Sequence, residues 1–587
     1  MVASLVKMKP TSATYTPISS SESDEALPTP SHPSPFHVTV SRRTYWALLG
    51  ALGTCFVILF ATATHIFLPS SPSSSSDSCP CKKPSDVPQY FQTSPELWAG
   101  PTKTGKTPFM AQTVTFNPTG TYVPNEPLRT AVPVEGMGDK DEGIFKMMGY
   151  LSPYTPSPGF GVDEYPLPAG AEIVQVQMLS RHGARYPTSN NNVYEFGKRI
   201  TAAEDLEASG PLEFLNNYEY ALGLETLVNR GRMELFDSGI LHNYMYGPLY
   251  NPNSKIIVRT TTQDRMLKSA EYFLAGFFGL EWTNNATIEV IIEQDKFNNS
   301  LAGWLNCPNG RKAPRRGSEA QKVWVETYLR NATDRLSKYV KGHDWTVEDT
   351  YAAQNMCPYE TVAYGFSRFC SLFTYEEWLG FSYSVDLAFY YNDGPGSPFG
   401  RAVGIGYQQE VMARLNNHTL GYSGSQINTT LDSSEVTFPL NQSLYLDFTH
   451  DTNIISVLTA FGLTQFEEAL PNSTYPGPHN FTVTHLTPFG ARLDIEIIKT
   501  PRPLAADRSG YLPTGGETKY VHFVLNQRTI PLGWSFPECD VFRLDGWCEF
   551  ETFLRVQEKM PGLANYEKVC QGQYDGELAD KEEKEWR

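Results

Sequence analysis

The chain has 587 residues, which is enough for one large domain and a smaller one. It contains 47 Lys and Arg against 64 Asp and Glu, so its formal net charge is −17 at pH 7. A general nucleic-acid-binding protein carries a basic stripe, and this composition argues against such a partner. Any site for a phosphate group must therefore be a local focus of positive charge in an acidic body.

The first segment of the chain resembles a tail followed by a membrane anchor. Residues 1–43 are rich in Ser, Thr and Pro and lack apolar periodicity, which indicates a disordered tail. The stretch from Tyr45 to Leu68 contains no Lys, Arg, Asp or Glu, and as a helix it would be about 36 Å long. We therefore predict a transmembrane anchor at residues 44–68. The alternative is a cleaved signal peptide, which would give a secreted form, but this needs a shorter apolar core nearer the start.

The charges around the anchor predict its orientation. Arg42 and Arg43 precede it, and no basic residue follows before Lys82, so the positive-inside rule places the tail in the cytosol. The rest of a single-pass type II protein would then be extracellular or luminal. Eight sequons for N-glycosylation lie after the anchor, at Asn285, Asn298, Asn331, Asn417, Asn428, Asn441, Asn472 and Asn480. Of nine cysteines, eight also lie after it, and an even number in an oxidising compartment suggests disulfides.

The segment that follows the anchor lacks regular periodicity. Residues 69–88 are rich in Ser and Pro and predict a stalk. From Tyr90 to Leu151, Gly and Pro are scattered among isolated aromatic residues, which predicts an irregular segment laid over the domain surface. We place the stalk and irregular segment at 69–145 and the folded domain at 146–575. A solvated charged tail at 576–587 ends the chain.

The first clear strand of the domain leads into an unusual octet. Residues 173–179 alternate and are rich in branched side chains. The octet then reads Arg181-His182-Gly183-Ala184-Arg185-Tyr186-Pro187-Thr188. Ligands of open α/β sheets bind beyond the carboxyl ends of strands, and two guanidiniums beside an imidazole suit a phosphoryl group. An imidazole nitrogen can also attack phosphorus, and Gly183 is expected to let the backbone approach a ligand closely.

Two later strand ends carry further candidate residues. A strand at 254–259 is followed by an amphipathic run, so Arg265 would lie at a helix N-terminus, where an anion is favoured. A helical insertion is expected at about 280–440, before a third strand at 444–448. That strand ends in His450-Asp451, which can supply a phosphate donor and an acid. Residues 492–498 and 520–525 alternate like later strands, so the predicted class is α/β.

These motifs resemble those of the histidine acid phosphatases. Arg-His-Gly-x-Arg-x-Pro-Thr is their signature, and the octet at 181–188 is similar to the form in fungal phytases. Residues 449–452 resemble the distal His-Asp motif, and residues 258–265 resemble the intermediate stretch that ends in a phosphate-binding arginine. The resemblance covers roughly residues 90–570. It implies a phosphoglycerate mutase-like sheet with flanking helices and a smaller helical insertion domain, with substrate bound in the cleft between them.

The resemblance also assigns roles. It makes His182 the nucleophile and Asp451 the general acid. The phosphoryl oxygens would be held by Arg181, Arg185, Arg265 and His450. Arg259 is better interpreted as part of a structural salt bridge. No metal or other cofactor is implied, because arginines and imidazoles already supply positive charge, and the substrate would be a small-molecule phosphomonoester, with phytate a candidate.

Cysteine pairs follow from the same resemblance. It implies disulfides between Cys357 and Cys370 and between Cys539 and Cys548. A third would join Cys307 to Cys570. The pairing of Cys79 and Cys81 stays open and includes an interchain bridge, and the oligomeric state is not predicted.

One departure from the family bears on substrate. Known phytases tend to carry lysines soon after the octet, whereas here residues 189–197 contain no cation before Lys198. This departure questions selectivity for phytate but not phosphatase activity.

Two other functions are alternatives to hydrolysis. A mutase of the wider superfamily must retain and return the phosphoryl group, whereas an open glycosylated ectodomain favours water as the acceptor. A catalytically inactive binding ectodomain needs neither a nucleophile nor an acid, so the retained set of His182, the arginines and His450-Asp451 argues against it.

Overall fold

The computed structural model describes residues 131–139, 142–189, 191–421 and 424–573. The predicted tail, anchor and stalk, the pair Cys79 and Cys81, and the charged tail at 576–587 lie outside the described residues. Within these described ranges, no helix is both long enough and apolar enough to cross a membrane.

A mixed eight-stranded sheet organises the domain, in the order β10-β8-β7-β1-β6-β3-β4, with β9 paired to β8. The neighbours β1, β6, β3 and β4 run parallel, and β7, β8 and β10 continue the sheet with antiparallel pairings. The strands are β1 (Glu172–Arg181), β3 (Ile256–Thr261), β4 (Ala286–Ile291), β6 (Leu444–Thr449), β7 (Arg492–Thr500), β8 (Thr518–Leu525), β9 (Arg528–Ile530) and β10 (Cys548–Glu549). The five strands predicted from alternation are confirmed, each with small shifts at its ends.

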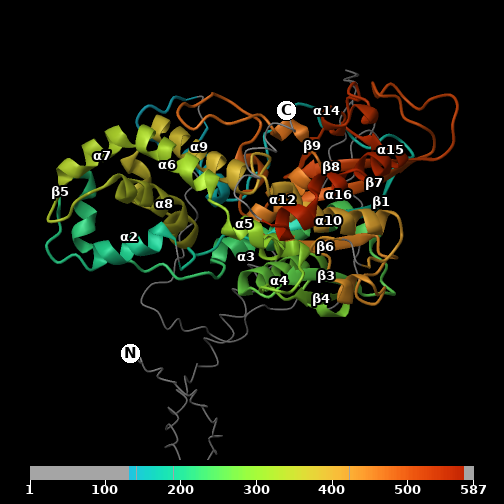
Figure 1. Ribbon diagram of the computed structural model, residues 1–587, viewed down its shortest axis with the longest axis horizontal. Coiled ribbons are helices and arrows are strands. Elements are labelled where there is room, and N and C mark those ends of the chain that lie inside the picture. The colour runs from blue at the N-terminus through green and yellow to red at the C-terminus, as the bar shows by residue number, and fades with distance from the viewer. Residues whose placement is uncertain (1–130, 140–141, 190, 422–423, 574–587) are drawn as a thin grey trace, which may run out of the picture. The chain divides into compact units, whose positions relative to one another are not determined.

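Helices cover both faces of this sheet (Figure 1). Because successive side chains of β1 point to opposite faces, Met178 joins the core under two helices while Leu179 joins the larger core on the other side. The two helices that cover Met178 are α3 (Asn229–Tyr246) and α4 (Asp264–Phe278), which pack against each other. The other face is covered by helices that include α10 (Gly400–Leu415) and α12 (Asp451–Ala460). The predicted α/β class is confirmed.

A group of helices lies to one side of the sheet in Figure 1. It comprises α2 (Asn192–Thr201), α6 (Arg316–Tyr328), α7 (Arg330–Leu336), α8 (Val347–Tyr364) and α9 (Tyr375–Asn392). Thr346 and Thr374 start α8 and α9 with reciprocal capping boxes, which satisfy the free backbone N–H groups of each first turn. Most of the group comes from the segment predicted as an insertion at about 280–440. However, α10 belongs to the same segment and packs against α12 at the sheet.

Residues 144–151 are part of the core, although their lack of periodicity predicts an irregular surface segment. Ile144 and Phe145 are buried, as are Met148 and Leu151, so residues 144–151 do not lie over the surface as expected. They form two single 3₁₀ turns, Ile144–Lys146 and Gly149–Leu151, which are too short to produce a periodic pattern. These residues are therefore part of the core, while the domain boundary at residue 146 stays a prediction.

Three disulfides close the described domain. They join Cys307 to Cys570, Cys357 to Cys370, and Cys539 to Cys548. All three pairs that the family resemblance implied are confirmed. The first links residues 263 positions apart, and thereby ties the C-terminal segment to the helical region that follows β4.

Candidate active site

Parallel pairing brings the two distant motifs together. Arg181, at the end of β1, is opposite Thr449, at the end of β6, so His182 and His450 leave neighbouring strands at the same edge. Their ring centroids are 5.8 Å apart. The next strand is β3, and Arg265 follows it in the first turn of α4. All six predicted site residues are buried, and the sheet order explains why they share one edge.

The Arg181 guanidinium is held by fixed acceptors. Its Nη1 donates to the backbone oxygens of Tyr150, at 2.5 Å, and Thr487, at 2.9 Å, while its Nη2 donates to Oδ2 of Asp451 at 2.5 Å. The guanidinium also lies 4.6 Å from the centre of the Phe489 ring. These contacts fix the orientation of the Arg181 guanidinium.

The contacts of His182 define which nitrogen is free. Its Nδ1 lies 2.9 Å from the backbone oxygen of Gly183, which can only accept a hydrogen bond, so Nδ1 carries the proton. The Nε2 lone pair is then available. Burial lowers the pKa of His182 well below its ordinary value, and the charges of Arg181 and Arg265 lower it further. Both effects favour the neutral form of the His182 imidazole.

His450 is positioned by a carboxylate that the sequence reasoning missed. Its Nε2 lies 3.0 Å from Oε2 of Glu293, and the edge of its ring packs against Trp304. Thr261 donates a further hydrogen bond to Glu293 at 2.5 Å. Burial opposes ionisation, but His450 and the hydrogen bonds hold the pKa of Glu293 below its ordinary value. Glu293 follows β4 by two residues. A carboxylate just beyond the end of a strand is the sequence feature that could have identified it as a site residue.

Asp451 begins α12 and faces the arginines. The backbone N–H of Thr452 donates to its Oδ1 at 2.8 Å, and Arg181 contacts the other oxygen. Burial alone would raise the pKa of Asp451, but the charges of Arg181 and Arg185 outweigh it, so this pKa lies below its ordinary value. Nearby, Arg265 donates from Nη1 to Glu225 at 2.8 Å, and Glu225 is a second carboxylate that the sequence reasoning missed.

The chain matches the family model described as histidine phosphatase superfamily (branch 2) over residues 172–526. The chain belongs to this superfamily. Phytase A of Aspergillus fumigatus is 33% identical over 407 residues, which cover 66% of this chain and 83% of the relative. Phytase A of Arthroderma benhamiae is 31% identical over 422 residues, covering 69% and 88% of the two chains.

A solved phytase has the same fold. The crystal structure of the phytase from D. castellii superposes with a TM-score of 0.58 at 25% identity, covering 73% of this chain and 88% of that one. The resemblance to histidine acid phosphatases and the fold that it implied are confirmed. The protein is thus a phytase-like histidine phosphatase, a hydrolase of phosphoric monoesters.

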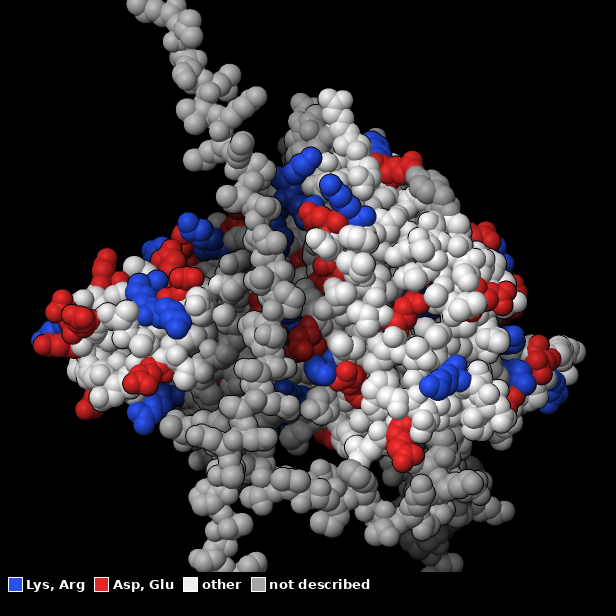
Figure 2. Space-filling view, turned by 90° about the horizontal axis from the view of Figure 1, so that it is seen from below, with Lys and Arg blue, Asp and Glu red and all other residues white. Residues whose placement is uncertain are grey.

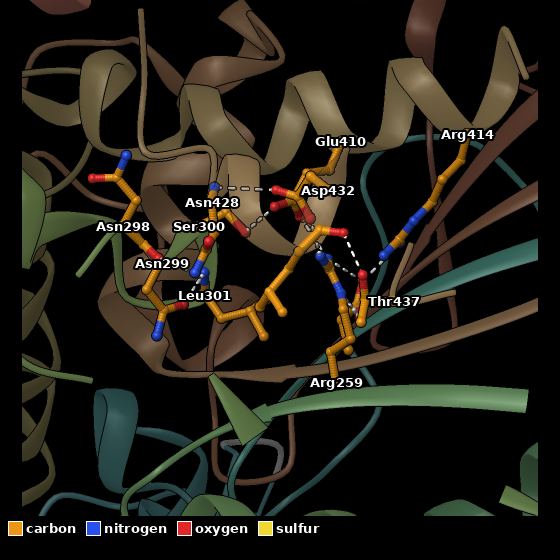
Figure 3. Close-up of polar contacts among 12 residues, drawn as sticks. Arg259, Asn298, Asn299, Ser300, Leu301, Glu410, Arg414, Asn428, Asp432 and Thr437 are labelled. Carbon is orange, nitrogen blue, oxygen red and sulfur yellow. Dashed lines mark hydrogen bonds and ion pairs between the residues drawn. The ribbon is translucent and has the colours of Figure 1, made fainter. Parts of the chain in front are cut away.

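Arg259 of β3 lies in a buried cluster of charged side chains (Figure 3). Arg259 Nε donates to Asp447 at 2.7 Å, and its Nη2 donates to Glu410 at 2.5 Å. Arg414 donates to the other oxygen of Asp447 at 2.8 Å. Burial and the adjacent Glu410 raise the pKa of Asp432, which also faces Arg259, to about 8. Arg259 therefore lies in a buried salt-bridge cluster, as predicted.

The cluster is hydrogen-bonded to the segment at residues 300–301, which in turn contacts the distal motif. Ser300 donates from Oγ to Glu410 at 2.6 Å, and its backbone oxygen accepts from Asn453 of α12 at 3.0 Å. Thr449 donates to the backbone oxygen of Leu301 at 2.6 Å. These bonds join the buried charges to the strand end that carries His450 and Asp451.

Gly183 lies in close contact with α3. A Cβ atom at this position would lie 2.2 Å from the backbone oxygen of Gly231 in α3. The absence of a side chain is therefore required by this contact with the helix. It lets the octet lie directly against α3.

Positive charge at the site comes from buried arginines. On the face shown in Figure 2, basic and acidic side chains are interspersed, with no continuous basic stripe among the described residues. Across the ranges that the structure describes, no three His, Cys, Asp or Glu side chains gather in a way that could hold a metal ion.

Proposed function

We propose that this histidine phosphatase hydrolyses phosphomonoesters in acid through a covalent phosphohistidine at His182. The observation that carries the proposal is the hydrogen bond from Nδ1 to the Gly183 carbonyl, which presents an unprotonated Nε2 among arginines. A neutral imidazole at low pH is the form that attacks phosphorus.

In the first step, the Nε2 lone pair forms a bond to phosphorus and the bond from phosphorus to the ester oxygen breaks. Asp451 donates its proton to that oxygen, which leaves as an alcohol. Arg181, Arg185, Arg265 and His450 hold the other phosphoryl oxygens, and their charges stabilise the transition state most where negative charge builds up. In the second step, water attacks phosphorus, the bond to Nε2 breaks, and the Asp451 carboxylate accepts the proton of the water.

Asp451 must gain a proton before the first step. It is ion-paired with Arg181, and its pKa is low. An arriving phosphoryl dianion draws the guanidiniums toward itself and adds negative charge beside the carboxylate, and both effects favour protonation of Asp451. The enzyme then takes up a proton when substrate binds, which favours activity in acid.

Phytate is one of the substrates that we propose, because the curated relatives described above are named as phytases. We also propose that residues 44–68 anchor the enzyme as a single-pass type II membrane protein, with the catalytic domain extracellular or luminal. The uncharged stretch after Arg43 and the sequons after it support this placement. Most of the full-length chain should then stay with membranes in carbonate, whereas recovery of a soluble form starting near residue 70 would favour a cleaved signal.

Activity is tested with the detergent-solubilised full chain and p-nitrophenyl phosphate. His182→Ala should lower kcat by about 10⁴-fold or more. The matched control is His418→Ala, since His418 is exposed and directly follows the turn after α10. If His182→Ala keeps substantial turnover, the nucleophile is another group.

A further inference from the structure

The outer face of α3 is apolar, although the solvent-facing side of a surface helix is usually polar. Four large side chains on it are between 36% and 55% exposed: Met233, Phe236, Ile240 and Tyr244. Their spacing of three and four residues places them in one stripe along the helix. The opposite side of α3 is buried in the core through Leu235. The helix is therefore apolar on both sides, and an exposed apolar stripe of this kind marks an interaction surface.

The stripe follows the heptad pattern of a two-stranded coiled coil. Met233 and Ile240 are seven residues apart and take the a positions, and Phe236 takes the d position between them. Arg232 then stands at a g position and Asp237 at an e position. In a parallel pair of helices, a g residue faces the e residue that lies five positions later on the other helix, and charges at these positions set the choice of partner.

Arg232 and Asp237 carry opposite charges, and neither is in an ion pair within the described part of the chain, whereas nearby Arg230 is paired with Glu234 at 3.4 Å. The Arg232 guanidinium lies 5.8 Å from the centre of the Tyr272 ring of α4. Asp237 is exposed. Because the two are five positions apart, each would meet the other's counterpart in a second copy that runs in the same direction. This charge pattern is complementary to itself, which favours a copy of the same chain over an unrelated partner.

We infer that the outer face of α3 is an interface with a second copy of this chain. The two helices pack side by side in the same direction about a two-fold axis, with Ile240 of each copy against Ile240 of the other. Salt bridges between Arg232 of one copy and Asp237 of the other flank this contact on both sides. The interface lies on the opposite side of α3 from Gly231, which contacts the octet, so each copy keeps its own site.

Sedimentation velocity of the detergent-solubilised full chain measures the oligomeric state. The native enzyme should be a dimer. Ile240→Glu brings two like charges together at the two-fold axis and should raise the dissociation constant of the dimer about tenfold or more. The matched control Val323→Glu changes a similarly exposed apolar residue of α6 and should leave the dimer unchanged. Turnover of p-nitrophenyl phosphate should stay within about twofold in both variants, which checks that the fold is intact.

Charge reversal tests the alignment of the two helices. Arg232→Glu and Asp237→Lys should each weaken the dimer, because each brings like charges together, and the double substitution should restore it. The inference is overturned if the native enzyme is a monomer, which would leave the face to a different occupant, or if Ile240→Glu and Val323→Glu have equal effects. Failure of the double substitution to restore the dimer would overturn the parallel alignment.

Discussion

Nη2 of Arg181 lies 2.5 Å from Oδ2 of Asp451, so the proposed acid and a proposed phosphate ligand are bound to each other. The pair fixes both side chains at the strand edge. It also keeps Asp451 ionised until a phosphoryl group competes for the arginine. In the proposed mechanism, binding of substrate and protonation of Asp451 are therefore coupled.

Asp451→Asn removes the transferable proton and keeps the size of the side chain. An alkoxide is a poor leaving group, whereas a nitrophenolate leaves with little help. The substitution should therefore lower kcat for glycerol phosphate by about 10²–10⁴-fold and affect p-nitrophenyl phosphate much less. Equal losses for both substrates, with chemistry shown to be rate-limiting, would mean that Asp451 only positions the phosphoryl group.

Arg259→Met should destabilise the fold. It leaves the carboxylates of Asp447 and Glu410 buried beside a neutral side chain, and loss of one partner of a buried pair costs about 3–5 kcal/mol. Urea unfolding measures the change. The control Arg330→Met removes an exposed arginine and should stay within about 0.5 kcal/mol of the native chain. Comparable effects of the two substitutions would contradict the structural role of Arg259.

Asp393→Asn should change stability in a pH-dependent way. The pKa of Asp393 is about 7 in the fold against an ordinary value of 3.8, so the folded state binds more protons between these values. The native chain therefore loses stability as pH rises from about 4 to about 7. Relative to it, Asp393→Asn should be more stable at pH 8 than at pH 4. A stability difference between the two proteins that is the same at both pH values would show that this carboxyl is not titrating as described.

One of the eight sequons should carry no glycan. Asn285 is only 6% exposed, its Oδ1 accepts from the Tyr250 hydroxyl at 3.1 Å, and its backbone oxygen accepts from Ile256. A glycan there would disrupt these contacts, whereas Asn331 is exposed on α7. Peptide mass spectrometry after enzymatic deglycosylation should find modification at Asn331 and none at Asn285. Full occupancy at Asn285 would contradict the packing around Tyr250.

The sheet could be predicted from sequence because its strands show alternating apolar and polar side chains or are rich in β-branched residues. The octet at 181–188 and the pair at 450–451 were predictable for the same reason, since each stands where a strand ends. Three disulfides followed from family resemblance. The short turns of residues 144–151 could not be found, because single 3₁₀ turns leave no periodic signature.

The supporting residues of the site were harder to predict. Glu293 and Glu225 act through contacts with His450 and Arg265 that form only when distant segments fold together. The octet predicts that the backbone at Gly183 is closely approached, but the neighbour that approaches it, Gly231 of α3, depends on helix packing.

Trapping of the covalent intermediate tests most directly whether His182 is the nucleophile. The full-length enzyme is mixed with ³²P-labelled substrate in acid and quenched rapidly in alkali. Label should stay on the native protein in alkali, be lost in acid, and map to the peptide that contains His182, with none on His182→Ala. Full turnover by the native enzyme with no label at His182, or alkali-stable label elsewhere, would contradict a phosphohistidine at this position.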